Sequence, residues 1–275
     1  PNIMRWVPFT IDEQTLRNRI KNKMIRPTTI PQTLDELQIE HAISREALRL
    51  ALIHHKSLAT ALKGVQQERT ISDVFEQQQS GKTLIDMLKL DLIVGSGGIL
   101  SHAPRRVQSM LMMVDAYEPL GVTRLSVDSI FMMPHLGVLS TINEKAATDV
   151  FIRDCMVYLG TCVAPIGQGK EGDRCADYTI TFPDGRVDKG QLSFGDLRLV
   201  PLSDGQKASI TVQPAKQVNL GAGAGVPVTR EVHGGVVGLL LDGRGRPLQL
   251  PADHNARVAS LTKWYQAVDL YPKGS

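Results

Sequence analysis

The first 160 residues show apolar positions at helical spacing between short apolar runs. Thr33 and Glu36 have the spacing of a capping box, in which a hydroxyl and a carboxylate bind unpaired amides at a helix start. Apolar residues recur after it at helical spacing, at Ile39, Ile43, Ala47 and Leu50. The pattern predicts a long helix that begins after Thr33 and buries this face. Residues before proline avoid the helical conformation, so residues 27–31 are predicted to be extended.

Strands and helices are predicted to alternate over the next part of the chain. A nearly continuous apolar run over residues 90–94 is typical of a strand buried on both faces, and it leads directly into the glycine loop Gly95–Gly98. One or two helical turns are predicted just before it, from residue 84. A helix over 105–117, a strand over 122–127 and a helix over 144–158 follow. This alternation favours an α/β layer with a partly parallel sheet.

The pattern changes to a period of two after about residue 160. Apolar and polar residues alternate over 178–182 and again over 208–212, and the sequence Pro183-Asp184-Gly185 is typical of a turn. Helical spacing returns only over 257–268, around Trp264. We therefore expect an α/β domain over residues 1–160 and a β-rich domain over 161–275, the second a small barrel or sandwich with a terminal helix.

Composition and charge narrow the class of protein. The chain has 275 residues, of which 42% are hydrophobic and 21% charged, and this balance excludes disordered and fibrous chains. Its 31 basic residues are interspersed with 28 acidic ones, so we expect no nucleic acid partner. No apolar run approaches the roughly 20 residues of a membrane span. Three cysteines without a Cys-x-x-Cys pair favour a soluble protein of the reducing cytoplasm.

The loop Gly95–Gly98 is the most informative candidate for chemistry. It follows a predicted strand and precedes a helix whose start we place near Pro104. Glycines permit positive φ and let backbone amides approach a ligand, while a helix start favours anionic groups. The loop therefore fits a nucleotide site. A tight crossover, in which the glycines only relieve crowding, explains the same residues equally well.

Two further glycine clusters and one lysine motif are weaker candidates. The clusters over 220–227 and 234–247 do not match the dinucleotide fingerprint and are interpreted as turns and bulges, with Asp242-Gly243 as a hairpin turn. Ser80–Thr83 ends like a phosphate-binding P-loop, but Glu76 stands where that motif needs glycine, so we reject it.

Several acidic and histidine residues have an ordinary interpretation beside a catalytic one. Asp115 and Asp128 lie near predicted element ends, where each either binds Mg²⁺ or caps a helix, and capping is favoured. His54 and His55 are adjacent and point in different directions on a helix, so a solvated face is the better interpretation. His135 follows a methionine-rich segment that is typical of a core or an adaptable interface. The spacing identifies no catalytic residue and no metal site.

Four blocks of the sequence resemble the glutamate mutase accessory family called MutL or GlmL, which is unrelated to the mismatch-repair protein of the same name. The blocks are distributed over nearly the whole chain, at residues 23–31, 92–106, 127–138 and 234–247. Members of this family are similar to actin-like ATPases and act as reactivating chaperones of adenosylcobalamin-dependent mutases. The resemblance implies the second lobe of an actin-like fold, with an adenosine-binding role for Gly95, Ser96, Gly97, Gly98 and Arg105.

One departure from the actin-like pattern limits the expected activity. The first lobe of such proteins begins with an Asp-x-Gly-x-Thr hairpin that binds phosphate, and the opening residues do not supply it. We therefore expect the C-terminal part of a longer protein. ATP with Mg²⁺ would be the cofactor of the whole protein, whereas this part would need no cofactor and would not hydrolyse ATP.

The partner expected from the resemblance is a subunit of the mutase, and self-association stays open. Two other functions also fit the sequence. One is a non-catalytic interaction module, in which the β-rich part binds a protein and the α/β part is scaffold. The other is a kinase-like enzyme that acts on a small molecule.

Overall fold

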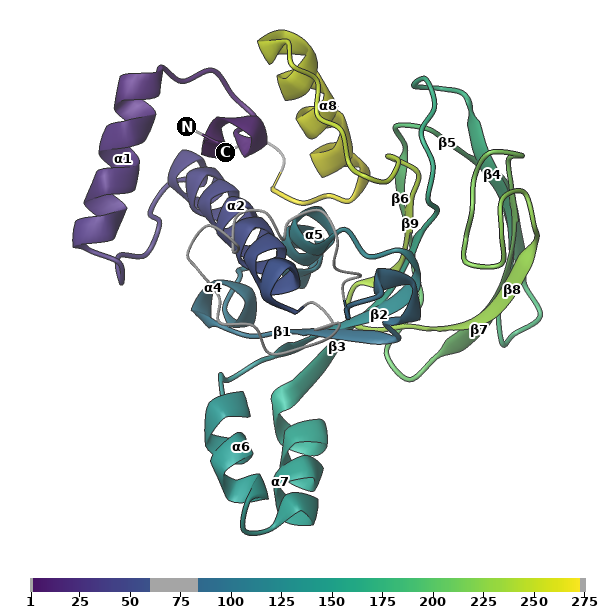
Figure 1. Cartoon of the computed structure of the whole chain (residues 1–275), viewed down its shortest axis with the longest axis horizontal. Helices are drawn as coiled ribbons and strands as arrows, with labels where there is room; N and C mark the ends of the chain where they lie inside the picture. Colours follow the sequence, from purple (N-terminus) through teal and green to yellow (C-terminus); the bar gives the residue numbers. More distant parts are fainter. Residues whose placement is uncertain (1, 60–83, 273–275) are drawn as a thin grey trace, which may run out of the picture.

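The structure is a computed structural model that describes residues 2–59 and 84–272 (Figure 1). The helices are α1 (Glu13–Ile25), α2 (Leu34–Leu58), α4 (Gly98–Ser101), α5 (Arg106–Tyr117), α6 (Met133–Ser140), α7 (Glu144–Val150) and α8 (His254–Ala267). Short 3₁₀ turns are η1 (Asn2–Trp6) and η3 (Met87–Lys89), and η4 (Phe151–Cys155) is a π-helical turn. The strands are β1 (Leu92–Gly95), β2 (Gly121–Asp128), β3 (Met156–Ala164), β4 (Arg174–Thr181), β5 (Val187–Ser193), β6 (Leu197–Val200), β7 (Lys207–Pro214), β8 (Val228–His233) and β9 (Gly238–Asp242).

A mixed five-stranded sheet is the centre of the fold, with the strand order β1-β2-β3-β9-β6. The pairs β1–β2 and β3–β9 are parallel, whereas β2–β3 and β9–β6 are antiparallel, which confirms a partly parallel sheet. The expectation that β1 is buried on both faces is wrong. This strand lies at the edge of the sheet, and Leu92 is 40% exposed.

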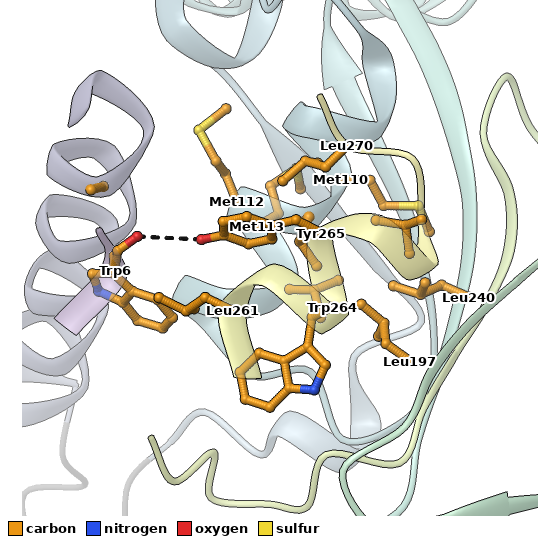
Figure 2. Packing of buried hydrophobic residues seen from close by; sticks show 14 of the residues in the cluster. Trp6, Met110, Met112, Met113, Leu197, Leu240, Leu261, Trp264, Tyr265 and Leu270 are labelled. Carbon is orange, nitrogen blue, oxygen red and sulfur yellow. Dashed lines mark hydrogen bonds between the residues drawn. The ribbon is translucent and has the colours of Figure 1, made fainter. Parts of the chain in front are cut away.

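Helices α2, α5 and α8 cover one face of this sheet (Figure 1). Their apolar cluster includes Met110–Met113 of α5, Leu240 of β9, and Leu261 and Trp264 of α8. Figure 2 shows these residues beside Trp6 of η1, whose carbonyl accepts a hydrogen bond of 3.3 Å from the Tyr265 hydroxyl. The main apolar core therefore joins the start of the chain to its last helix.

Helix α2 begins where the capping pattern predicts, but it buries a different face. The Thr33 hydroxyl accepts the Glu36 N–H at 3.3 Å, while the Glu36 carboxylate accepts the N–H of Gln32 at 2.7 Å and not that of Thr33. Of the predicted stripe, Ile39 is buried, but Ala47 is exposed and Leu50 is 45% exposed. The buried face also carries the polar residues His41, Ser44, Arg45 and Glu46, and three of these bind distant side chains: His41 binds Tyr271, Arg45 binds Asp115 and Glu46 binds Trp6.

The four-stranded antiparallel sheet, in the order β5-β4-β7-β8, packs against the other face of the five-stranded sheet. Leu239 and Leu241 of β9 share an apolar cluster with Ile180 of β4 and Ile210 of β7, whereas Leu240 between them points to the helices. The described strands thus form a mixed α/β fold with two packed sheets and no closed barrel. The boundary predicted at residue 160 falls inside β3, and β6 and β9 complete the sheet that β1–β3 begin.

A helical hairpin made of α6 and α7 projects from the sheet between β2 and β3 (Figure 1). It has a small core of its own, formed by Leu136, Ala147 and Cys155. Helix α6 was not predicted, and the helix expected over 144–158 ends at residue 155, where β3 takes over. Residues 156–158 pair in register with β2, so tertiary hydrogen bonds override the helical pattern of these first residues of β3.

The predicted turns have mixed outcomes. The turn at residues 183–185 is confirmed, since the Phe182 N–H donates to the Arg186 carbonyl at 2.9 Å between β4 and β5. No hairpin follows β9 at Asp242, because its sheet neighbours are β3 and β6. The segment predicted as extended over 27–31 opens with a turn at 27–28, and the helical turns expected from residue 84 reduce to η3. The terminal helix is confirmed as α8.

Candidate functional site

The glycine loop lies at the carboxyl ends of two neighbouring parallel strands. Strand β1 ends at Gly95, which pairs in register with Val127 of β2, and β2 ends one residue later at Asp128. Residues that follow parallel strands meet at one edge of the sheet, which is where α/β folds usually bind ligands. The fold therefore places the loop Gly95–Gly98 and the Asp128 carboxylate side by side.

The glycines of this loop have different structural roles. A Cβ on Gly95 would lie 2.7 Å from the sulfur of Met113, so this glycine is needed for packing against α5. Gly97 has a φ of 111° and stands at the N-cap of α4, a conformation that side chains rarely adopt. A Cβ on Gly97 or on Gly98 would meet no atom within 4 Å. Crowding thus accounts for the first glycine, while the space beside the other two is open.

Arg105 lies apart from the open side of the loop. The chain forms α4 directly after the loop, an element that was not predicted, and α5 then begins at Arg106 close to the predicted start. The backbone N–H of Arg105 donates to the Gln108 side chain at 3.1 Å, and its guanidinium donates to the Asp269 carboxylate at 2.6 Å. The structure therefore groups Gly95, Ser96, Gly97 and Gly98, and it holds the Arg105 side chain against the C-terminal segment.

Asp128 connects the glycine loop, α4 and the projecting hairpin. Its carboxylate accepts the backbone N–H of Met133 at 2.8 Å, in the first turn of α6, and the Ser96 hydroxyl at 3.4 Å. Its carbonyl accepts a short hydrogen bond from the Ser101 hydroxyl of α4. Asp128 is not the N-cap residue of α6, which is Met132, but its carboxylate binds an N–H of the first turn and links the hairpin to the loop.

The pKa of Asp128 lies below its ordinary value. Burial by itself would raise the pKa of this carboxyl, but hydrogen bonds from the backbone N–H groups of Met133, Met132 and Ile130, and from Ser96, lower it. Asp128 is therefore ionised at neutral pH and supplies a buried negative charge at the base of the loop. The negative charge of Asp128 fixes the positions of hydrogen-bond donors of the protein, and it would repel an anionic ligand.

Asp115 has neither of the two roles considered from the sequence. It lies inside α5 with 1% of its surface exposed, so it is neither a cap nor accessible to a metal ion. Its two oxygens accept from Arg45 at 2.7 Å and from Arg244 at 2.8 Å, and Arg244 also pairs with Asp242. Sequence reasoning missed this buried network. Its signal in the sequence is the group Asp242, Arg244 and Arg246, which follows the apolar run of residues 236–241.

The remaining candidates are exposed or lie outside the described residues. His54, His55 and His135 are exposed, which confirms a solvated face for the first two. Among residues 2–59 and 84–272 no group of three His, Cys, Asp or Glu side chains is arranged to hold a metal ion. The rejected motif Ser80–Thr83 lies outside the described residues. No helix among the described residues has the length and apolar character needed to cross a membrane.

The comparison with known families identifies the group to which these residues belong. The profile described as MutL protein matches residues 1–155, more than half of the chain. This chain belongs to the MutL family. The family is that of the glutamate mutase accessory proteins and not of mismatch repair. Neither a curated protein nor a solved structure matches the chain. The MutL match contains the glycine loop, α5, β2 and the hairpin, and it ends where β3 begins.

Proposed function

We propose that this MutL chain forms the adenosine-binding second lobe of an actin-like ATPase that reactivates an adenosylcobalamin-dependent mutase. The observation that carries the proposal is the open space beside Gly97 and Gly98, at the carboxyl ends of parallel strands within the family-matched residues. A purine approaches backbone closely only where no side chain intervenes, and these two residues meet that condition.

The residues around the loop would have different roles in nucleotide binding. Gly95 lets the end of β1 pack directly on α5, which fixes the position of the loop. Ser96 donates to the buried Asp128 carboxylate, which holds the side chain back from the open space. Gly97 and Gly98 would then present their backbone to the adenosine. Arg105 keeps α8 and the following residues in place through Asp269 and would act on the site only indirectly.

ATP with Mg²⁺ would supply the driving reaction, the transfer of a phosphoryl group to water. We assign no Mg²⁺ ligand to the described residues, and we expect no ATP hydrolysis by this chain alone. In the complete protein, nucleotide-dependent closure of two lobes would favour the state of the mutase that releases damaged cofactor. A ligand shifts such an equilibrium only as far as it binds the two states differently.

Calorimetric titration with ATP and ADP tests the proposal on the purified chain. We expect weak binding of both nucleotides, since the adenosine is the part that contacts the loop. Gly98→Asp should abolish the heat of binding, because the new carboxylate would enter open space without a clash in the fold. The matched control is Gly137→Asp on α6, where a Cβ also meets no atom within 4 Å. Equal binding by the Gly98→Asp variant and the wild-type chain would refute the adenosine site.

The second candidate function is a non-catalytic interaction module. Exposed apolar side chains on the α6–α7 hairpin favour it, namely Val138, which is 69% exposed, and Ile142, which is 84% exposed. Such side chains at the tip of a projection suit contact with another protein. Absence of binding heat at millimolar nucleotide, together with co-elution of the chain and the mutase subunit during gel filtration without nucleotide, would favour this module.

A further inference from the structure

A groove lies between α1 and α2, and none of its lining residues belongs to the glycine loop. It has a volume of 670 Å³, which lies within the range of small-molecule sites. Its walls come from α1, the connection after it and the first half of α2. The lining residues are Arg19, Asn22, Lys23, Ile25, Arg26, Thr29, Ile30, Pro31, Gln32, Glu36, Ile39, Glu40 and Ile43.

The groove is braced at one point and otherwise left open. Within α1, Leu16 alone is buried, so this helix packs only lightly on the rest of the chain. The Lys23 ammonium forms an ion pair of 2.8 Å with Glu40 across the groove, and it also donates to the Thr29 carbonyl of the connection. These contacts fix the width of the groove while leaving its interior unfilled.

Hydrogen-bond donors of α1 face this space without partners. Arg19 and Asn22 are three residues apart on one side of α1, and Arg26 follows them as the residue that ends the helix. In residues 2–59 and 84–272, none of these three side chains makes a hydrogen bond or ion pair, and the Nη1 atom of Arg19 is buried without an acceptor. A buried guanidinium nitrogen without an acceptor is costly unless a ligand supplies one.

The carboxylates of the groove are already occupied. Glu40 pairs with Lys23, and Glu36 accepts the backbone N–H of Gln32 at 2.7 Å. The lining has three basic side chains, Arg19, Lys23 and Arg26, and the two carboxylates of Glu36 and Glu40, so its formal charge is positive by one. The apolar lining of the groove that is free for contact comes from Ile25, which is 76% exposed, Ile30, which is 77% exposed, and the partly buried Ile43, whereas Ile39 packs into the main core.

We infer that the α1–α2 groove binds a small amphiphilic anion. Its carboxylate or phosphate head would pair with Arg19 and Arg26, and its apolar body would lie on Ile25, Ile30 and Ile43. Guanidinium groups suit such heads because they donate two parallel hydrogen bonds to paired oxygens. This site does not depend on the nucleotide proposed for the glycine loop, since the two share no residue.

Calorimetric titration with four probes tests the site on the purified chain: octanoate, octyl phosphate, octanol and inorganic phosphate. We expect octanoate or octyl phosphate to bind, and whichever binds more tightly identifies the head group. Octanol and inorganic phosphate, which each lack one half of the ligand, should bind at least about tenfold more weakly. The double variant Arg19→Gln/Arg26→Gln should lower the affinity for the amphiphilic anion by a similar factor. The control is Arg17→Gln on the same helix, whose side chain pairs with Glu13 outside the groove.

Several results would overturn the inference. The inference is wrong if octanoate and octyl phosphate both fail to bind at millimolar concentration, and the groove would then fit a macromolecular partner instead. Equal binding of octanol and octanoate would remove the role of the arginines. An equal loss of affinity in Arg17→Gln would show that the total positive charge of the protein, and not the two arginines of the groove, determines binding of the anion. Far-ultraviolet circular dichroism checks that each variant folds, and Gly98→Asp should bind the amphiphile like the wild type, which separates this site from the nucleotide site.

Discussion

The guanidinium of Arg45 donates to the carboxylate of Asp115 at 2.7 Å, and both side chains are completely buried. This pair joins α2 to α5. The second oxygen of Asp115 accepts from Arg244, which follows β9 and pairs in turn with Asp242. Arg45 and Asp115 lie within the family-matched range, whereas Asp242 and Arg244 lie beyond it. A single buried network of charges therefore holds the matched residues to the C-terminal strands.

Asp115→Ala is expected to lower the free energy of unfolding by about 3–5 kcal/mol, because it leaves Arg45 and Arg244 buried without their shared acceptor. Urea denaturation followed by circular dichroism measures this change. The control is Asp149→Ala, which removes an exposed ion pair with Lys145 and should cost less than about 1 kcal/mol. Similar midpoints for the two variants would contradict a structural role for the buried network.

The sequence predicts elements whose signals are local. The capping residue Thr33, the alternation in β7 and the period of α8 each lie inside one element, and all three elements are present. The loop Gly95–Gly98 was also found from local residues. The proximity of this loop to Asp128 was not predicted, because that proximity depends on the register between β1 and β2, which are separated along the chain.

Partners that are distant in sequence explain the errors. Asp242-Gly243 has the composition of a hairpin turn, but Asp242 is held by Arg244 and Arg246 instead, and β9 pairs with strands far from it. Likewise the buried face of α2 was misplaced because apolar spacing cannot show that Arg45 finds a carboxylate on another helix. Apolar periodicity locates a core face only where the core is apolar.

Gly160→Ala is expected to disrupt the pairing of β3 with β9. Gly160 has a φ of 137°, and a Cβ there would lie 1.8 Å from the Gly238 carbonyl oxygen, in the register pair that starts this ladder. We expect a loss of more than about 3 kcal/mol, or failure to fold, by urea denaturation. Gly172→Ala is the control, since its φ of 89° is strained but a Cβ meets no atom within 4 Å. A Gly160→Ala variant as stable as that control would contradict the close approach of the two strands.

The three cysteine thiols are expected to be unreactive in the folded chain. All three are free and buried, and burial raises the pKa of Cys162 and of Cys175 to about 12 and also raises that of Cys155. Only the thiolate reacts rapidly with disulfide reagents. Colour release from a thiol-reactive disulfide at pH 8 should therefore be slow for the native protein and complete in urea. Rapid release by the native chain would show that at least one of these sites opens.

His41 makes the stability of the fold depend on pH between about 3 and 6.5. Burial, and next to it the positive charge of Arg45, lowers the pKa of His41 from 6.5 to about 3. The ring is completely buried, with its Nδ1 atom 2.9 Å from the Tyr271 hydroxyl. In this pH range the unfolded chain binds a proton that the folded chain does not, so the free energy of unfolding falls as the pH falls.

The effect of His41 is measured by urea denaturation at pH 7, 6 and 5. Between pH 6 and pH 5 its contribution to the loss of unfolding free energy should be about 1 kcal/mol, close to the limit of 1.4 kcal/mol per pH unit for one proton. His41→Gln should lose this part of the pH dependence, whatever its stability at pH 7. His54→Gln, at an exposed position of the same helix, should keep it. Parallel curves for the wild type and His41→Gln would mean that water reaches the ring and that the core between α2 and the C-terminal residues opens below neutral pH.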